Sequence, residues 1–217
     1  MRNFLFLCKE ISVGKSVTRA FYNLRLKQDS LEGVVLDIGG GKNSDYLNFM
    51  SRAENVTFLT LDVKAGAVVD FEKDRLPVED ATADTVLFLN VMEHIYNHKH
   101  ILSEVFRITK PGGKLIGVVP FLMWYHQDPR DYFRYTHEAL EKIFSECGIS
   151  NYTIEPIARG PFTAASQMVI QSLPRIVRVP VFALHYALDG IFLKLRPTQG
   201  ERYVLGYYFS INKQYPS

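Results

Sequence analysis

The run Val34–Gly41, Val-Val-Leu-Asp-Ile-Gly-Gly-Gly, constrains the fold more than any other stretch of the chain. Its apolar and β-branched residues are typical of a strand that is buried on both faces. The three glycines end that strand, because glycine adopts positive φ angles and lets the backbone approach a ligand closely. Asn43, Ser44 or Asp45 then offers a side-chain oxygen that can cap a helix. An ordinary glycine-rich turn is the alternative, but strand, glycine turn and helix are the opening unit of a nucleotide-binding α/β domain.

The rest of the chain predicts an alternation of strands and helices. We expect strands at 34–38, 56–61, 84–90, 114–120, 152–157 and 203–211, with a further short strand near 68–71. We expect helices at 3–28, 44–53, 101–110 and 136–147. Such an alternation produces a parallel sheet that is covered by helices on both faces. The fold class is therefore α/β: a Rossmann-like, doubly wound, mostly parallel seven-stranded sheet with an antiparallel edge strand.

A chain of 217 residues is long enough for one domain with a substantial core. We divide this single domain into an N-terminal helical segment (1–30), a core (31–158), a helical insertion (159–202) and a final strand (203–217). The net charge of +2 gives no reason to expect nucleic acid as a partner. Two distant cysteines, Cys8 and Cys147, form neither a disulfide framework nor a metal signature, so we expect a cytoplasmic protein without a metal site.

Polar side chains stand at the ends of four successive predicted strand segments. These residues are Asp37, Asp62, Asp70 and Asn90. Ligands of such sheets bind beyond the carboxyl ends of the strands. Asp62, 25 residues after Asp37, can accept hydrogen bonds from both hydroxyls of a ribose. Asp70 can accept from the exocyclic amine of a base, against which Phe71 can pack.

The dinucleotide fingerprint and the P-loop are two other glycine motifs that could explain the turn at Gly39–Gly41. A dinucleotide fingerprint has the form Gly-x-Gly-x-x-Gly, whereas Gly39-Gly40-Gly41 is followed by Lys42, Asn43 and Ser44. The third glycine, which lets the helix pack close to the strand, is therefore replaced by Ser44. The P-loop motif does not occur in the chain. An NAD-dependent oxidoreductase is thus the less favoured interpretation of the glycine turn.

The ordered set of motifs resembles the class I S-adenosylmethionine-dependent methyltransferases of the "type 11" kind. The residues that carry the resemblance are 36–41 (Leu-Asp-Ile-Gly-Gly-Gly), 61–62 (Leu-Asp), 70–77 (Asp-Phe-Glu-Lys-Asp-Arg-Leu-Pro), 83–86 (Ala-Asp-Thr-Val), 91–94 (Val-Met-Glu-His) and 110–115 (Lys-Pro-Gly-Gly-Lys-Leu). Each motif is weak alone, whereas their order and spacing over residues 33–150 are specific. The resemblance implies S-adenosyl-L-methionine as the cofactor.

The resemblance also implies which residues contact this cofactor. They are Asp37, Gly39, Gly40, Gly41, Asp62, Val63, Asp70, Phe71 and Asn90. In this assignment Asp37 faces the methionine ammonium, Asp62 holds the ribose hydroxyls, and Asp70 accepts from the adenine amine. Val63 packs against adenine, and Asn90 lies beneath the methionyl part.

The loop 120–136 is the predicted acceptor site, because it follows the fifth core strand and combines aromatic, acidic and basic residues. Its candidate substrate-binding residues are Trp124, Tyr125, Asp131, Tyr132 and Arg134. His126 is the first choice for a general base and His94 the second, since histidine titrates near neutrality. A purely structural role for His126, bonded to Asp131 or Asp128, is the alternative. The run 126–136 also resembles a segment of methyltransferases associated with glycan or surface-polysaccharide biosynthesis.

The insertion at 161–200 is apolar and basic, which is typical of segments that lie on anionic membranes. Its most apolar run, Val179–Leu188, is too short to span a bilayer, and we expect Pro174 and Pro180 to divide it into short pieces. A helical cap over the acceptor site or a dimer surface is the alternative.

Together these features predict methyl transfer from S-adenosylmethionine to a small-molecule or glycan acceptor, at a hydroxyl oxygen. A non-catalytic cofactor-binding module that docks on a membrane or a protein is the second hypothesis.

Overall fold

The computed structural model describes residues 1–41, 44–61 and 69–215. Its main sheet has six strands in the order β4-β2-β5-β6-β8-β7. Their bounds are β2 Val34–Ile38, β4 Thr57–Leu61, β5 Ala83–Leu89, β6 Thr109–Pro120, β7 Tyr152–Ala158 and β8 Val204–Asn212. The Rossmann-like, mostly parallel sheet is thus confirmed, with six strands where seven were predicted. The expected short strand near 68–71 is not formed: Val69, Asp70 and Phe71 are described and lie in a loop and a turn, while residue 68 lies outside the described residues.

The antiparallel strand lies inside the sheet and not at its edge, which corrects the sequence prediction. β8 pairs antiparallel with both β6 and β7, so that β7 is the edge strand. The reason is the path of the insertion: the chain leaves β7 after Ala158 and re-enters the sheet at Val204, its register partner. Because both residues lie at the same end of the sheet, β8 has to run back in the opposite direction.

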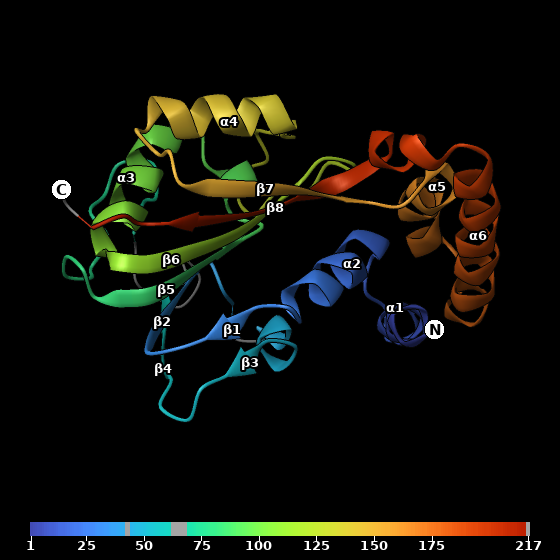
Figure 1. Cartoon of the computed structure of the whole chain (residues 1–217), viewed down its shortest axis with the longest axis horizontal. Coiled ribbons are helices and arrows are strands. Elements are labelled where there is room, and N and C mark those ends of the chain that lie inside the picture. Colours follow the sequence, from blue (N-terminus) through green and yellow to red (C-terminus); the bar gives the residue numbers. More distant parts are fainter. Residues whose placement is uncertain (42–43, 62–68, 216–217) are drawn as a thin grey trace.

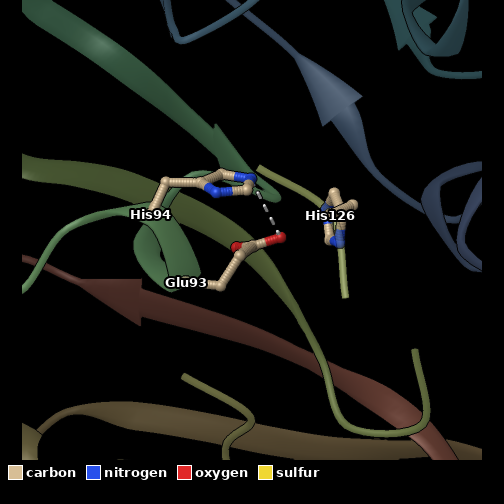
Figure 2. Close-up of side chains that lie close together, drawn as sticks. All are labelled: Glu93, His94 and His126. Atoms are coloured by element: carbon tan, nitrogen blue, oxygen red, sulfur yellow. Dashed lines mark ion pairs between the residues drawn. The ribbon is translucent and has the colours of Figure 1, made fainter. Parts of the chain in front are cut away.

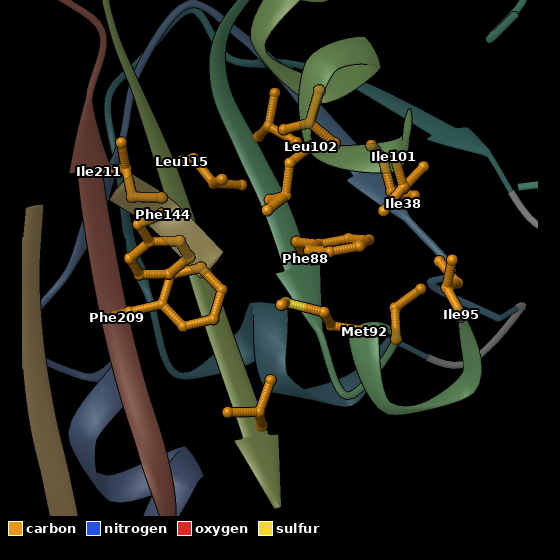
Figure 3. Packing of buried hydrophobic residues seen from close by; sticks show 14 of the residues in the cluster. Ile38, Phe88, Met92, Ile95, Ile101, Leu102, Leu115, Phe144, Phe209 and Ile211 are labelled. Atoms are coloured by element: carbon orange, nitrogen blue, oxygen red, sulfur yellow. The ribbon is translucent and has the colours of Figure 1, made fainter. Parts of the chain in front are cut away.

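Helices cover both faces of the sheet (Figure 1). One face carries α3 His98–Ile108 and α4 His137–Glu146, while α2 Val17–Leu26 covers the other face. Asn97 and Thr136 cap α3 and α4 by accepting hydrogen bonds from the backbone N–H groups of His100 and Ala139. The core between β5 and these two helices contains Phe88, Leu102 and Phe144 with Phe209 of β8, all fully or almost fully buried (Figure 3).

Two predicted helices differ from their expected form. The segment 3–28 is divided into α1 Arg2–Ser12 and α2 because Gly14 adopts φ +98°, which ends the first helix. The segment 44–53 contains the short 3₁₀ helix η1 Asp45–Asn48 and then the strand β3 Ser51–Arg52. β3 pairs with β1 Ser30–Leu31. The backbone N–H groups of Ser51 and Ala53 donate to the carbonyls of Asp29 and Leu31, so they do not extend the helix.

The insertion forms α5 Pro161–Val169, the 3₁₀ turn η4 Ile170–Ser172, α6 Arg175–Leu195 and the 3₁₀ segment η5 Pro197–Arg202. With α1, the helices α5 and α6 form one end of the molecule, away from the C-terminus (Figure 1). Pro180 lies within α6 and does not break it, contrary to the sequence prediction. The carbonyl that loses its partner belongs to Ile176, which is 85% exposed, so water can bond to it.

α6 is also longer than the apolar run that suggested it. It has 21 residues with a mean hydropathy of 1.5 over its most apolar stretch, and 11% of that stretch is buried. Among the described residues it is the one helix whose length and composition would suffice to cross a membrane. The expectation from Val179–Leu188 alone, that this segment is too short, is therefore corrected.

Candidate functional site

The glycine turn after β2 is built around the buried carboxylate of Asp37. Asp37 is 1% exposed and accepts hydrogen bonds from the hydroxyls of Tyr46 and Ser44, the latter over 3.0 Å. A Cβ atom on Gly40 would lie 2.0 Å from Asp37 Oδ2. Gly39 adopts φ +75°, and a Cβ atom there would lie 2.5 Å from Val91 Cγ2. Both positions therefore require glycine, because Asp37 and Val91 fill the space that a side chain would need.

The end of β5 approaches this turn. Asn90 adopts φ +54°, a left-handed conformation that is uncommon outside glycine but that asparagine takes more readily than most residues. Its N–H donates to Val118 O over 2.9 Å, which ties the end of β5 to β6. The contact of Val91 with Gly39 joins the two strand ends, so that Asp37, the glycines and Asn90 share one edge of the sheet.

The other predicted cofactor residues are placed as follows. Asp62 and Val63 lie outside the described residues. Asp70 accepts from the Glu72 N–H over 3.0 Å, and this bond holds the pKa of its half-exposed carboxyl below the usual range. The ring of Phe71 packs into the main hydrophobic core, while Gly41 is exposed and accepts from the Ser44 hydroxyl at its carbonyl.

A second buried carboxylate follows β5. Glu93 lies in the 3₁₀ turn η3 Met92–His94 and is fully buried. Among the described residues neither of its carboxylate oxygens has a hydrogen-bond partner. Burial raises the pKa of this carboxyl to about 8. The Glu93 carbonyl accepts from the Tyr132 and Phe133 N–H groups, which anchors the loop 121–136 over η3.

His94 and His126, the two predicted bases, meet at this carboxylate (Figure 2). Their rings are 5.1 Å apart between centroids and nearly perpendicular. His94 Nε2 lies 3.9 Å from Glu93 Oε1, and His94 Nδ1 bonds to the carbonyl of Arg130. Burial lowers the pKa of His94. One ligand atom from each of these three residues lies within 4.8 Å of the others.

Asp131 and Arg134 shape the loop that carries His126. Their side chains form a two-bond ion pair of 2.6 and 2.8 Å, which lowers the pKa of Asp131 to about 2. Asp131 also accepts from the His126 N–H over 2.8 Å, and Arg134 donates to the carbonyls of Met123 and Trp124. The polar groups of both residues are thus engaged within the loop.

Three aromatic residues of the loop, unlike Asp131 and Arg134, are exposed at its surface. Trp124 and Tyr132 are each 37% exposed and Tyr125 is 70% exposed, so that ring faces remain accessible to a ligand. Tyr132 also packs against Tyr96, which follows η3. They provide an aromatic rim near the Glu93–His94–His126 cluster.

Sequence reasoning placed Glu93 in a motif but gave it no role. The signal that was available is its position on the same turn as His94, directly after a strand with a polar end. Its complete burial and its distance to His126, 33 positions away, depend on the fold of the loop.

Comparison with known proteins places this architecture in a family. Residues 13–157 match the family model described as "Methyltransferase domain", and the chain therefore belongs to this family. A solved S-adenosylmethionine-dependent methyltransferase from Archaeoglobus fulgidus shares the fold, with a TM-score of 0.55 and 16% identity over 96% of this chain and 99% of that one. S-adenosylmethionine is accordingly the cofactor of this domain, and the turn of Asp37, Gly39 and Asn90 fits it.

The curated relatives match a smaller part. A demethylmenaquinone methyltransferase of Bacillus cereus is 27% identical over 120 residues, which are 54% of this chain and 51% of that protein. An uncharacterized protein of Methanocaldococcus jannaschii is 33% identical over 105 residues, 44% of each chain. The chain thus spans about half the length of the curated relatives that it matches.

Proposed function

We propose that this chain transfers the methyl group of S-adenosylmethionine to a hydroxyl oxygen of a small-molecule or glycan acceptor. The observation that carries the proposal is the Glu93–His94–His126 cluster next to the glycine turn. Val91 contacts Gly39 and lies two residues before Glu93, so the cofactor edge and the cluster are continuous. An acceptor on the aromatic rim would meet both.

The cofactor, when bound, supplies a methyl group that its sulfonium has already activated. In the transfer, an oxygen–carbon bond forms and the carbon–sulfur bond breaks, with its electron pair going to sulfur. The chain therefore has to position the acceptor and to withdraw its hydroxyl proton. Glu93, His94 and His126 are suited to the second task, while Asp131 and Arg134 hold His126 in place.

The same cluster favours oxygen over nitrogen as the acceptor atom. A neutral amine attacks without first losing a proton, whereas a hydroxyl gains nucleophilicity from deprotonation. Three groups that can act on one proton therefore suit a hydroxyl. The exposed rings of Trp124, Tyr125 and Tyr132 support a ring-shaped acceptor such as a sugar, since aromatic side chains pack on flat apolar surfaces.

Calorimetric titration of the full chain with S-adenosylmethionine and S-adenosylhomocysteine is the first test. We expect both to bind, and an Asp62→Ala variant to bind at least about tenfold more weakly because it lacks the ribose contact. Folded protein that binds neither compound would refute the proposal. An Asp62→Ala variant of unchanged affinity would show that the ribose site is misplaced.

The acceptor atom is tested with methyl-labelled cofactor and a panel of sugars, nucleotide sugars, quinols and amines. A methyl ether resists mild alkali, a methyl ester releases methanol, and a methylamine gains a basic group. Label in an alkali-stable, non-basic product that hydriodic acid releases as methyl iodide identifies a methyl ether and supports the proposal. Label that appears only in amines, esters or carbon-methylated quinols contradicts it.

A further inference from the structure

We propose that Glu93, His94 and His126 form a binding site for a divalent transition-metal ion that coordinates the acceptor hydroxyl. Two imidazoles and one carboxylate are a common ligand set for such ions, with further positions open to substrate. The use of the ion on an acceptor rests on the function proposed above, whereas metal binding itself does not. No metal-binding spacing is visible in the sequence, because the three ligands come from η3 and from a loop 32 residues after His94.

The geometry of the three side chains suits one ion. Their ligand atoms lie within 4.8 Å of one another. Ligands on one ion at bonds of about 2.1 Å are at most about 4.2 Å apart. Three such ligands at octahedral or tetrahedral angles are about 3.0–3.4 Å apart, so the side chains have to approach one another by about 1.5 Å to hold the ion. In Figure 2 the Glu93 carboxylate points into the space between η3 and the His126 loop.

Glu93 provides an independent reason to expect a ligand. Its side chain is fully buried, and neither oxygen has a hydrogen-bond partner among the described residues. A buried carboxylate without partners is costly, so it either takes up a proton or faces a cation. Arg134 is close to Glu93, but its guanidinium is already paired with Asp131. The charge of Arg134 acts on Glu93 from a distance, but no cation of the described residues forms a hydrogen bond with it.

The contacts of both histidine rings suit metal ligation through Nε2. Nδ1 of His94 donates to the Arg130 carbonyl, which leaves Nε2 free on the side of Glu93. Nδ1 of His126 lies 3.3 Å from the Trp124 carbonyl and 3.7 Å from Asp131 Oδ2, which leaves its Nε2 free as well. Carbonyl and carboxylate partners on the second ring nitrogen are the usual surroundings of a ligating histidine.

With a cation at this position, all three side chains have the same role: they bind the ion that contacts the acceptor hydroxyl. The ion lowers the pKa of a hydroxyl that it contacts, and the proton leaves to solvent past the partly exposed His126. With the ion bound, Glu93, His94 and His126 promote the loss of the hydroxyl proton as ligands of that ion, in place of the direct withdrawal that the metal-free cluster would perform. Two open positions would suit two adjacent hydroxyls, as in a sugar or a catechol.

The test uses full-length protein freed of metal by chelation, without cofactor or acceptor. Mn²⁺ is titrated and followed by electron paramagnetic resonance, with Zn²⁺ and Mg²⁺ as competitors. We expect one Mn²⁺ per chain, and at least about tenfold weaker binding in Glu93→Gln, His94→Gln and His126→Gln. His137→Gln, a partly exposed histidine of α4, is the matched control and should bind like the wild type.

The results separate this proposal from the methyltransferase proposal. Absence of Mn²⁺ and Zn²⁺ binding at millimolar concentration, or equal binding by His126→Gln, overturns the metal site. His126 lies on a surface loop, so this variant is expected to fold even if Glu93→Gln does not. Metal binding without any methyl transfer would refute the proposed function alone, and transfer that chelation leaves unchanged would refute the role of the ion.

A different surface carries a second proposal: we infer that α6 lies flat on an anionic lipid bilayer. Its outer face exposes an apolar stripe at spacings of three and four residues, formed by Ile176, Pro180, Leu184, Ala187, Ile191 and Leu195. Such a stripe along 21 residues is the pattern of an interfacial helix.

The charges at this surface indicate the kind of partner. Arg175 begins the helix, and Lys194 and Arg196 stand at its end. The single acid of α6, Asp189, is buried and accepts from the Phe162 and Thr163 N–H groups at the start of α5. The stripe thus has basic side chains at both ends and no exposed acid within α6, which complements anionic headgroups.

The packing of α6 decides between lying on a membrane and crossing it. Phe182 is fully buried in a cluster with Leu7 and Ile11 of α1. A spanning helix would have to expose both Phe182 and Asp189, so α6 lies in the interface with the fold intact. Gln167 of α5 contacts Met123 of the acceptor loop, which places this end of the protein next to the proposed acceptor site. A lipid-linked acceptor on the cytoplasmic face of a membrane would suit this arrangement.

Vesicle flotation tests the surface. We expect full-length protein to float with phosphatidylcholine vesicles that contain 30% phosphatidylglycerol, at least about tenfold more than with pure phosphatidylcholine. A Leu184→Glu/Ile191→Glu variant should lose this binding, while Leu59→Glu, an exposed leucine of β4, should keep it. Equal flotation of all variants, or a wild-type dimer in light scattering that the double variant abolishes, would overturn the proposal.

Discussion

Two buried carboxylates stand at the ends of neighbouring strands, and the fold treats them differently. Asp37 lies in β2, next to its last residue, and accepts hydrogen bonds from the hydroxyls of Tyr46 and Ser44. Glu93 follows β5 and has no hydrogen-bond partner among the described residues. Asp37 is thus stabilised by partners within the glycine turn, whereas Glu93 depends on a proton or an external cation. The difference is one of hydrogen bonding: side chains of the described residues bond to the first carboxylate, and none bonds to the second.

The largest expected effect comes from removing the charge of each carboxylate in turn. Glu93→Gln should reduce methyl transfer by about 10³-fold, because it removes the charged ligand, and should leave the affinity for S-adenosylmethionine within about twofold. Asp37→Asn should instead weaken cofactor binding by at least about tenfold. Steady-state kinetics and calorimetry on both variants check this, with Glu141→Gln on α4 as the control. A Glu93→Gln variant with full activity would contradict the comparison.

The second prediction concerns pH and the metal-free protein. The folded pKa of Glu93, about 8, exceeds its ordinary value of 4.5, so the folded chain binds the proton more tightly than the unfolded chain. Its contribution to stability is complete below about pH 4.5 and is lost as the pH rises toward 8. The free energy of unfolding should therefore decrease by several kcal/mol over this range. Urea unfolding at pH 5 and pH 8 measures it.

Glu93→Gln is the control for this measurement, because glutamine has nearly the same shape and does not titrate. The part of the pH slope that is due to Glu93 should be absent in the variant. A wild-type slope that the substitution leaves unchanged would show that the carboxylate is already compensated within the protein.

The third prediction tests the crowding around Asp37. Gly40→Ala would place a methyl group 2.0 Å from Asp37 Oδ2, so the carboxylate has to leave its hydrogen bonds. We expect a loss of about 2 kcal/mol in unfolding free energy together with weaker cofactor binding. Gly190→Ala is the matched control, since the nearest atom to its added carbon is 4.0 Å away in an α-helix, and it should be neutral or stabilising. Equal effects of the two substitutions would refute the argument.

The smallest effect concerns the support of His126. Arg134 holds the pKa of Asp131 at about 2, below its ordinary value of 3.8, so this contribution is present above pH 4 and is lost as the pH falls toward 2. Asp131→Asn should reduce stability at pH 7 by about 1–2 kcal/mol and remove this part of the acid sensitivity. Thermal unfolding between pH 2 and 7 tests it. A variant that retains the full wild-type acid transition would count against the ion pair.

Much of the glycine turn after β2 could be predicted because its signals are local. The strand, the glycines and Asp37 are contiguous, and the conformations of Gly39 and Asn90 agree with a turn that approaches a ligand. The caps at Thr136 and the end of α4 at Gly148 were also predictable, since each depends on residues within one helical turn. The roles of Asp62 and Val63 stay predictions.

The other features depend on contacts between distant residues. The position of β8 inside the sheet follows from the path of the insertion, and no strand pattern contains that information. Pro180 is accommodated within α6 because the carbonyl of Ile176, which loses its hydrogen bond, lies at the surface where water can bond to it. A local rule about proline does not consider this exposure.

The sequence by itself determined the fold class, the glycine turn and the family, because strand periodicity and turn chemistry act over a few residues. Only the tertiary structure decided that Glu93 is buried without a partner and that His126 meets it from another part of the chain. It also decided which face of α6 is exposed. Burial and side-chain proximity are properties of packing between elements, so they appear only when the sheet, the loop and the insertion are assembled.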